Sequence, residues 1–118
     1  MARIVLIEDD STILDTLTRA LRRLGHAVWA YGDIGRPQSD DALARADLII
    51  ADWVDGAGAL LAAAKSCDRP VPVLVITGQL DAEPQARRNG ADAVLLKPFL
   101  LPELEAAIDS LVREEHRA

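Results

Sequence analysis

The chain has 118 residues, which is enough for one hydrophobic core and too few for two, so we expect a single domain over residues 1–118. Its only cysteine, Cys67, excludes an intramolecular disulfide and fits a reducing compartment. The net charge of −6 argues against a nucleic-acid partner, and the first apolar run is too short for a signal peptide or a membrane span. We therefore expect a cytoplasmic domain that binds neither nucleic acid nor membranes.

Short apolar runs recur along the chain and are typical of strands that helices cover on both faces. They are Ile4–Ile7, Ala27–Tyr31, Asp47–Asp52, Val73–Ile76 and Asp92–Leu96. On the second of them, Trp29 and Tyr31 alternate with Val28 and Ala30. This alternation predicts that one face of that strand packs in the core and that the other is covered by a helix.

Helical segments follow each strand. The first has an apolar stripe from Ile13 to Leu24, with Asp10 or Ser11 as the expected N-cap and Gly25 at its end. The others are Ser39–Ala46, Ala59–Ala64, Asp81–Asn89 and a helix that opens at Pro102 and frays into the tail Arg113–Ala118. Five strand-then-helix units predict an α/β fold: an open parallel sheet between two layers of helices.

Ligands of such sheets bind beyond the carboxyl ends of the strands, so the residues at these ends are the candidate site. Four of the five predicted strands end in polar side chains of complementary chemistry. These are Glu8, Asp9 and Asp10 after the first strand, Asp52 at the end of the third, Thr77 after the fourth and Lys97 after the fifth.

Crowded carboxylates repel one another unless a cation compensates them, and Mg²⁺ is the natural compensator because it prefers oxygen ligands. Lys97 and Thr77 would then offset and bond the oxygens of a transferred phosphoryl group, with Asp52 as the attacking nucleophile. Each residue also has an ordinary structural role, such as a helix cap for the acidic residues or a strand-end hydroxyl for Thr77. Their conjunction at four strand ends favours the functional interpretation.

Over its whole length the chain resembles the receiver domains of bacterial two-component response regulators. The matching motifs are Ile7-Glu8-Asp9-Asp10, Ile50-Ala51-Asp52-Trp53, Val75-Ile76-Thr77-Gly78 and Leu96-Lys97-Pro98-Phe99. The resemblance implies a flavodoxin-like (βα)5 three-layer sandwich with a five-stranded sheet of order 2-1-3-4-5. It also implies a cis peptide before Pro98.

The same resemblance implies a function in phosphorelay signal transduction. Asp52 would accept a phosphoryl group from a sensor histidine kinase or a histidine phosphotransfer protein and thereby switch the binding of a downstream protein. Asp9 and Asp52 would ligate Mg²⁺ directly, Glu8 through water, and Val54 through its main-chain carbonyl. Thr77 and Lys97 would be the signalling pair. Such a domain is a phosphoacceptor rather than an enzyme, although it can remove its own phosphoryl group. The apolar side chain of Val54 suggests that this self-dephosphorylation is slow.

Two departures from the family pattern concern the site and the switch. The loop Val54–Gly58 is short and lacks the usual Met-Pro turn. This departure affects where the Val54 carbonyl, the implied metal ligand, is placed. Val94 stands where many receivers carry a switch aromatic residue. We therefore expect the signal to travel through Thr77 and the following loop into the Asp81–Asn89 segment.

Two other functions remain open from the sequence. One is a pseudo-receiver that binds partners without phosphorylation, and the other is a small aspartyl-phosphate phosphatase. The phosphatase ranks lower because it would want an acid two residues after its nucleophile, where Val54 stands. The expected protein is a free-standing regulator or a receiver taken from a hybrid kinase. An apolar stretch, Phe99-Leu100-Leu101, is either an exposed docking patch or packed under its loop.

Overall fold

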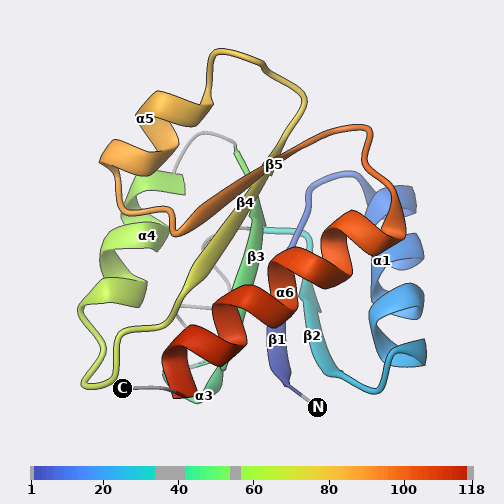
Figure 1. The fold of residues 1–118 in the computed structure, drawn as a ribbon, viewed down its shortest axis with the longest axis horizontal. Helices are drawn as coiled ribbons and strands as arrows, with labels where there is room; N and C mark the ends of the chain where they lie inside the picture. Colours follow the sequence, from blue (N-terminus) through green and yellow to red (C-terminus); the bar gives the residue numbers. More distant parts are fainter. Residues whose placement is uncertain (1, 34–41, 54–56, 117–118) are drawn as a thin grey trace.

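The computed structural model describes residues 2–33, 42–53 and 57–116, and side chains as far as Val112. Five parallel strands form one sheet in the order β2-β1-β3-β4-β5, and helices cover both of its faces (Figure 1). The strands are β1 (Arg3–Ile7), β2 (Ala27–Tyr31), β3 (Leu48–Asp52), β4 (Val73–Thr77) and β5 (Ala93–Leu96). The predicted α/β fold and its strand order are therefore confirmed.

The described helices are α1 (Ser11–Arg23), α3 (Ala42–Arg45), α4 (Ala57–Lys65), α5 (Glu83–Arg88) and α6 (Leu101–His116). A helix that spans a bilayer needs about 20 mostly apolar residues. None of the helices in the described ranges has the length and hydropathy for this.

Local side-chain chemistry sets the ends of α1. The Asp10 carboxylate accepts hydrogen bonds from the backbone N–H groups of Thr12 and Ile13 at 2.9 and 3.1 Å, so Asp10 is the N-cap. Gly25 lies just beyond the other end with φ of +94°, a conformation that glycine adopts without strain. The predicted ends of this helix are confirmed.

Other helix ends differ from the prediction. The helix α4 starts two residues before Ala59, α5 starts two residues after Asp81, and α6 starts at Leu101. At α6 the Glu103 carboxylate accepts the Leu100 N–H at 3.0 Å, a capping interaction that apolar periodicity does not reveal. Of the predicted helix Ser39–Ala46, residues 42–45 are helical and residues 39–41 lie outside the described part of the chain.

Successive side chains of the central strands enter two separate cores because a strand alternates its faces. On β3, Ile49 and Ala51 pack against α3, α4 and α5, whereas Leu48 and Ile50 pack against α1 and α6. All four side chains are almost completely buried. This burial holds the carboxyl end of β3, at Asp52, in a fixed position within the sheet.

The edge strand β2 is less covered than predicted. Val28 is buried against the α1 side, but Trp29, on the opposite face, is 45% exposed. The expectation that a helix covers this face is therefore wrong for Trp29. An edge strand has one neighbouring strand instead of two, so its outer side chains depend on flanking helices for cover.

Asp47 fastens the amino edge of the sheet. Its carboxylate is 13% exposed, accepts the Arg3 backbone N–H at 2.8 Å, and lies 3.5 Å from the side chains of Arg3 and Arg69. Burial alone would raise the pKa of Asp47, but the hydrogen bonds and charge of Arg3 outweigh it and hold the pKa below its ordinary value. The carboxylate therefore stabilises the folded chain above the unfolded-state pKa of about 3.9 and loses this effect as the pH falls through the native value.

Asp47→Asn is expected to lower the free energy of unfolding by about 1 kcal/mol at pH 7, because it removes a charge-assisted acceptor. The difference from the parent chain should begin to shrink below about pH 4, where Asp47 of the unfolded chain becomes protonated, and vanish as the pH falls through the lower native pKa. Urea denaturation at pH 7, 5 and 3.5 measures both effects. Asp15→Asn, at an exposed i,i+4 pair with Arg19, is the control and should change stability by less than about 0.5 kcal/mol. If the difference in unfolding free energy between the parent chain and Asp47→Asn stays constant with pH, the stabilising role of the Asp47 carboxylate is contradicted.

Candidate functional site

The candidate site lies at the edge of the sheet where the carboxyl ends of four neighbouring strands meet. The strand register pairs Ile7 with Ala51, Asp52 with Ile76, and Thr77 with Leu96. Glu8, Asp52, Thr77 and Lys97 therefore each lie within one residue of the same level across the sheet. The structure therefore brings these four of the residues selected from the sequence close together.

Lys97 joins the two most buried carboxylates of this edge. Its Nζ atom lies 2.9 Å from Oε2 of Glu8 and 3.3 Å from Oδ1 of Asp52. Glu8 is 1% exposed, and the Asp52 side chain is 15% exposed. Removing these carboxylates from water is unfavourable unless a cation compensates their charge. In the protein without a metal ion, Lys97 is that cation.

The pKa values of Glu8 and Lys97 both differ from their ordinary values. Burial raises the pKa of Glu8, and the hydrogen bond from Lys97 offsets this only in part. Burial alone would lower the pKa of Lys97, but its hydrogen bond to Glu8 and the charge of Asp52 outweigh burial and raise it. Lys97 therefore carries its positive charge at neutral pH.

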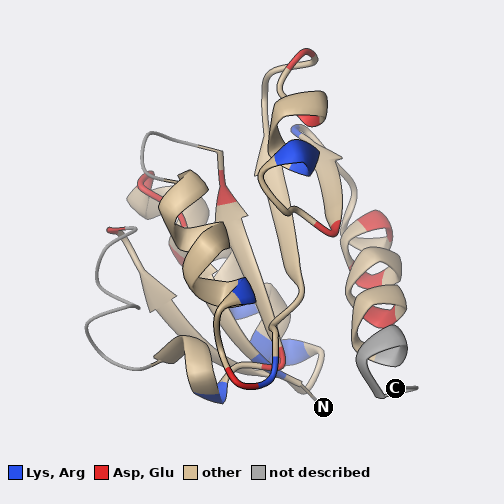
Figure 2. Ribbon diagram, turned by 90° about the vertical axis from the view of Figure 1, so that its left-hand side faces the viewer, with Lys and Arg blue, Asp and Glu red and all other residues tan. Residues whose placement is uncertain are grey.

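The carboxylates of Glu8, Asp9 and Asp52 form a cluster that could hold a divalent cation. One oxygen from each lies within 4.8 Å of the others, and Asp9 is exposed to solvent. Acidic residues also recur along α6 (Figure 2), but within the described residues this strand-end cluster is the only group of three with such spacing. The predicted ligand at the Val54 carbonyl lies outside the described residues.

Asp10 is separated from this cluster by its role as the α1 cap. Its backbone N–H nevertheless donates to Oε1 of Glu8 at 3.2 Å, which helps to orient the Glu8 carboxylate. Sequence alone placed three acidic residues after the first strand, and the capping geometry shows which of them is structural.

Thr77 is 2% exposed and lies on the strand between Asp52 and Lys97. Its hydroxyl oxygen accepts the Gln79 N–H at 3.1 Å, and its carbonyl accepts the Lys97 N–H at 2.7 Å. Within the described residues no acceptor is bonded to the hydroxyl hydrogen, so Thr77 can donate it to a ligand. The Lys97-Pro98 peptide is cis, as the resemblance implied.

A cavity beside Lys97 extends the site toward α1 and was not foreseen from the sequence. It has a volume of about 440 Å³ and is lined by Thr12, Ile13, Thr16, Leu17, Lys97, Pro98 and Phe99. Phe99 is half-buried against the core, whereas Leu100 and Leu101 are 69% and 40% exposed. Packing under the loop is therefore confirmed for Phe99, and Leu100 and Leu101 form the exposed part of the stretch.

The fold and the strand-end residues define a class: a parallel α/β domain with an acidic, lysine-bridged centre at the carboxyl edge of its sheet. No protein-family model matches the chain. Among curated proteins it is similar to the transcriptional regulatory protein PrrA of Mycobacterium leprae, with 32% identity over 94% of this chain and 50% of the relative. It is also similar to the transcriptional regulatory protein QseB of Haemophilus influenzae, with 34% identity over 97% of this chain and 54% of the relative.

Among solved structures, the response regulator receiver domain protein of Clostridium thermocellum is similar in fold. Its TM-score is 0.84 at 25% identity, with 98% of each chain covered. The chain thus spans about half the length of the curated relatives it matches and nearly all of this isolated domain. These similarities support the identification of the chain as a response regulator receiver domain.

Lys97→Met is expected to lower the free energy of unfolding by about 2 kcal/mol at pH 7.5 in chelator, because it leaves the Glu8 carboxylate buried without a cation. Without Lys97 the pKa of Glu8 rises further above its unfolded value. The loss should therefore shrink as the pH falls toward 5 and Glu8 becomes protonated. Chemical denaturation at the two pH values measures this.

The matched control is Lys65→Met, which removes the only other lysine of the chain. Lys65 pairs with Asp92 at a partly exposed position, so its loss should change stability by less than about 1 kcal/mol at both pH values. Equal effects of the two substitutions at both pH values would refute the assigned role of Lys97.

Proposed function

We propose that the domain is a phosphoacceptor in which Asp52 takes a phosphoryl group from a phosphohistidine. One observation carries this proposal: Asp52 belongs to a three-carboxylate cluster and simultaneously contacts Lys97, with the Thr77 hydroxyl on the neighbouring strand. A nucleophile, a cation and a hydroxyl donor are the parts that phosphoryl transfer onto a carboxylate needs.

The described residues support a division of roles. A carboxylate oxygen of Asp52 forms the new P–O bond while the P–N bond of the donor breaks and its electron pair returns to the imidazole ring. Lys97 moves from its bridge between two carboxylates to a phosphoryl oxygen, and Thr77 donates its hydroxyl hydrogen to another. The buried strands hold these groups in place, which lowers the entropic cost of alignment.

The chemistry of the cluster fits Mg²⁺, since all three side chains offer oxygen and one of them is open to water. Asp9 and Asp52 would bind the ion directly and Glu8 through water. When bound, Mg²⁺ offsets the charge that three carboxylates and a phosphoryl group bring together.

The proposed partners are a sensor histidine kinase or histidine phosphotransfer protein as donor and a protein as downstream target. PrrA and QseB are each described as transcriptional regulatory proteins, about half of whose length this chain matches. The apolar cavity beside Lys97 supports a protein donor, because it offers a docking surface next to the phosphoacceptor.

We also propose that Thr77 carries the signal, since Val94 packs half-buried against the core and has no ring to reorient. Thr77 accepts the backbone N–H of Gln79, so drawing its hydroxyl toward a phosphoryl group would shift the loop that leads to α5. This loop contains Leu80, which is 82% exposed, so the moving segment presents an apolar side chain to a partner.

Incubation with Mg²⁺ and acetyl phosphate should add one phosphoryl group to the parent chain, as measured by intact mass. Asp52→Asn should add none, because an amide is not a nucleophile, and Lys97→Met should reduce the rate at least tenfold. Asp15→Asn, on the exposed face of α1, is a control for general carboxylate modification. An equal adduct on Asp52→Asn would overturn the assignment.

A Mg²⁺ titration followed by Trp53 fluorescence separates a working receiver from a pseudo-receiver. Trp53 directly follows Asp52, and its half-buried side chain packs against the core, so ion binding at Asp52 can change the surroundings of the indole. The parent chain should show a saturable change, which Asp9→Asn weakens at least tenfold. A flat trace together with no phosphoryl adduct would favour the pseudo-receiver.

Thr77→Ala is expected to keep phosphorylation at Asp52 but to remove its effect on the β4–α5 loop and on α5. Amide NMR spectra with and without acetyl phosphate measure this, through the shifts of residues 78–88. Val94→Ala is the control and should leave those shifts intact. Phosphorylation-dependent shifts of α5 that persist in Thr77→Ala would exclude this route.

A further inference from the structure

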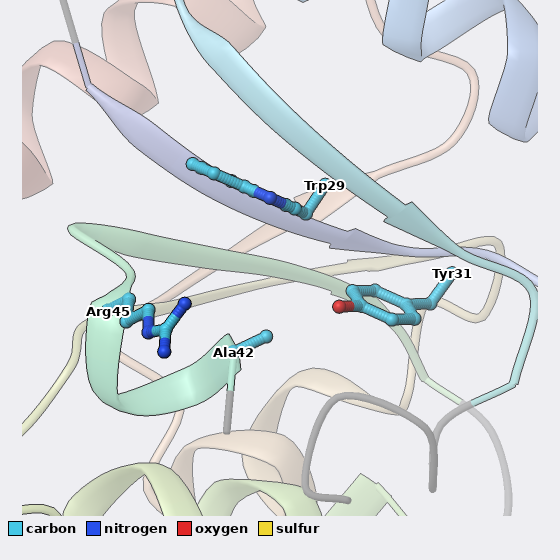
Figure 3. A pocket seen from close by; sticks show the side chains of 4 residues that line it. All are labelled: Trp29, Tyr31, Ala42 and Arg45. Atoms are coloured by element: carbon cyan, nitrogen blue, oxygen red, sulfur yellow. The ribbon is translucent and has the colours of Figure 1, made fainter. Parts of the chain in front are cut away.

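A second candidate binding site lies on the edge strand β2, on the sheet face that α3 and α4 cover. Trp29 and Tyr31, two residues apart on one face of the strand, line a cavity of about 100 Å³ together with Ala42 and Arg45 of α3 (Figure 3). The helix α3 is anchored by the buried Leu43, which fixes the position of its two lining residues.

The polar groups of this cavity have no partner in the described part of the chain. No ion pair or hydrogen bond involves the Arg45 guanidinium or the Tyr31 hydroxyl there. Figure 3 shows the hydroxyl of Tyr31 and the guanidinium of Arg45 directed toward each other across the space above Ala42. Both groups can donate hydrogen bonds, and the guanidinium fork matches a carboxylate in geometry and charge.

Trp29 supplies the apolar wall. Trp29 is 45% exposed, although it is a large aromatic residue with a cavity beside it. An indole face next to hydrogen-bond donors is typical of contact surfaces, where it covers the methylene groups of an incoming side chain. The combination therefore suits a ligand with a carboxylate at the end of a short aliphatic stem.

The volume limits the ligand further. Pockets for small molecules and cofactors occupy roughly 300–1,000 Å³. A cavity of about 100 Å³ accommodates a carboxylate with one or two methylene groups and excludes a nucleotide or an aromatic metabolite. This volume suits a single acidic side chain of a larger molecule.

We propose that Trp29, Tyr31 and Arg45 form an anchor site for an acidic side chain, glutamate or aspartate, of a partner protein. The charge of the chain supports this choice, since a domain of net charge −6 repels acidic segments except at an arginine such as Arg45, which has no ion pair among the described residues. The site goes beyond the phosphoacceptor function and does not require it. It is nevertheless close to that function, because the Tyr31 carbonyl accepts the Glu8 backbone N–H at 3.0 Å.

The test is an NMR titration of the full chain with the blocked tripeptide acetyl-Ala-Glu-Ala-amide, and with its glutamine counterpart as the neutral probe. The expected result is saturable shifts of the Trp29 indole N–H and the Arg45 side chain, with a Kd of about 1–10 mM, which is typical of one isolated anchor. The glutamine peptide should bind at least fivefold more weakly, as should acetate, which lacks the stem that contacts Trp29. A Trp53→Phe chain assigns the Trp29 signal, because these are the only two tryptophans.

Variants separate the site from general charge attraction. Arg45→Gln should weaken binding of the glutamate peptide at least fivefold, because it removes a charged donor at an exposed position. Tyr31→Phe should weaken it about twofold, because it removes the hydroxyl and keeps the half-buried ring. Arg23→Gln, an exposed arginine of α1 on the opposite sheet face, is the control and should change the Kd by less than twofold. Asp52→Asn should bind like the parent, which keeps this test independent of the phosphoacceptor proposal.

Three outcomes would overturn the proposal. They are equal binding of the glutamate and glutamine peptides, unchanged binding by Arg45→Gln, and peptide shifts centred on α1 instead of β2 and α3. Acetate that binds as tightly as the glutamate peptide would overturn the assignment to a side chain.

Discussion

The contact of one ammonium group with two carboxylates organises the functional edge of this domain. Lys97 bridges Glu8 and Asp52 and comes from the far end of the chain, so β5 must dock beside β4 before the carboxylates of β1 and β3 are compensated. Two buried like charges would otherwise oppose the folding of the strands that carry them. In the proposed function, the same contact holds a cation next to Asp52, where it would offset the charge of an incoming phosphoryl group. Structural compensation and chemistry therefore depend on one side chain.

The sheet holds the functional side chains in fixed relative positions. Four strands reach the same level through their register, and each is fixed by side chains that enter two opposite cores. The proposed phosphoryl transfer would need alignment more than a deep pocket, because its reacting groups are few and the donor protein would bring the phosphoryl group. In the proposed function, the apolar cavity beside Lys97 would receive the donor protein. The exposed Leu80 lies in the loop that is expected to change with Thr77.

The strands and the site could be predicted from sequence because continuous apolar runs define buried parallel strands, and the topology of such sheets collects their carboxyl ends. The ends of α4, α5 and α6 could not, since capping contacts such as that of Glu103 with Leu100 leave no periodic signal. The exposure of Trp29 and the cavity at Arg45 also escaped prediction. Both depend on how a four-residue helix packs beside an edge strand, and only tertiary structure determines that.

The central claim is that Asp52 itself becomes phosphorylated, and chemical trapping of the acyl phosphate tests it most directly. The chain is phosphorylated with acetyl phosphate and Mg²⁺, reduced with borohydride, digested and sequenced by tandem mass spectrometry. Reduction of an aspartyl phosphate yields homoserine, so the account predicts homoserine at position 52 and at no other aspartate. Homoserine at Asp9 or elsewhere, or an unmodified Asp52 in a chain that has gained a phosphoryl group, would contradict it.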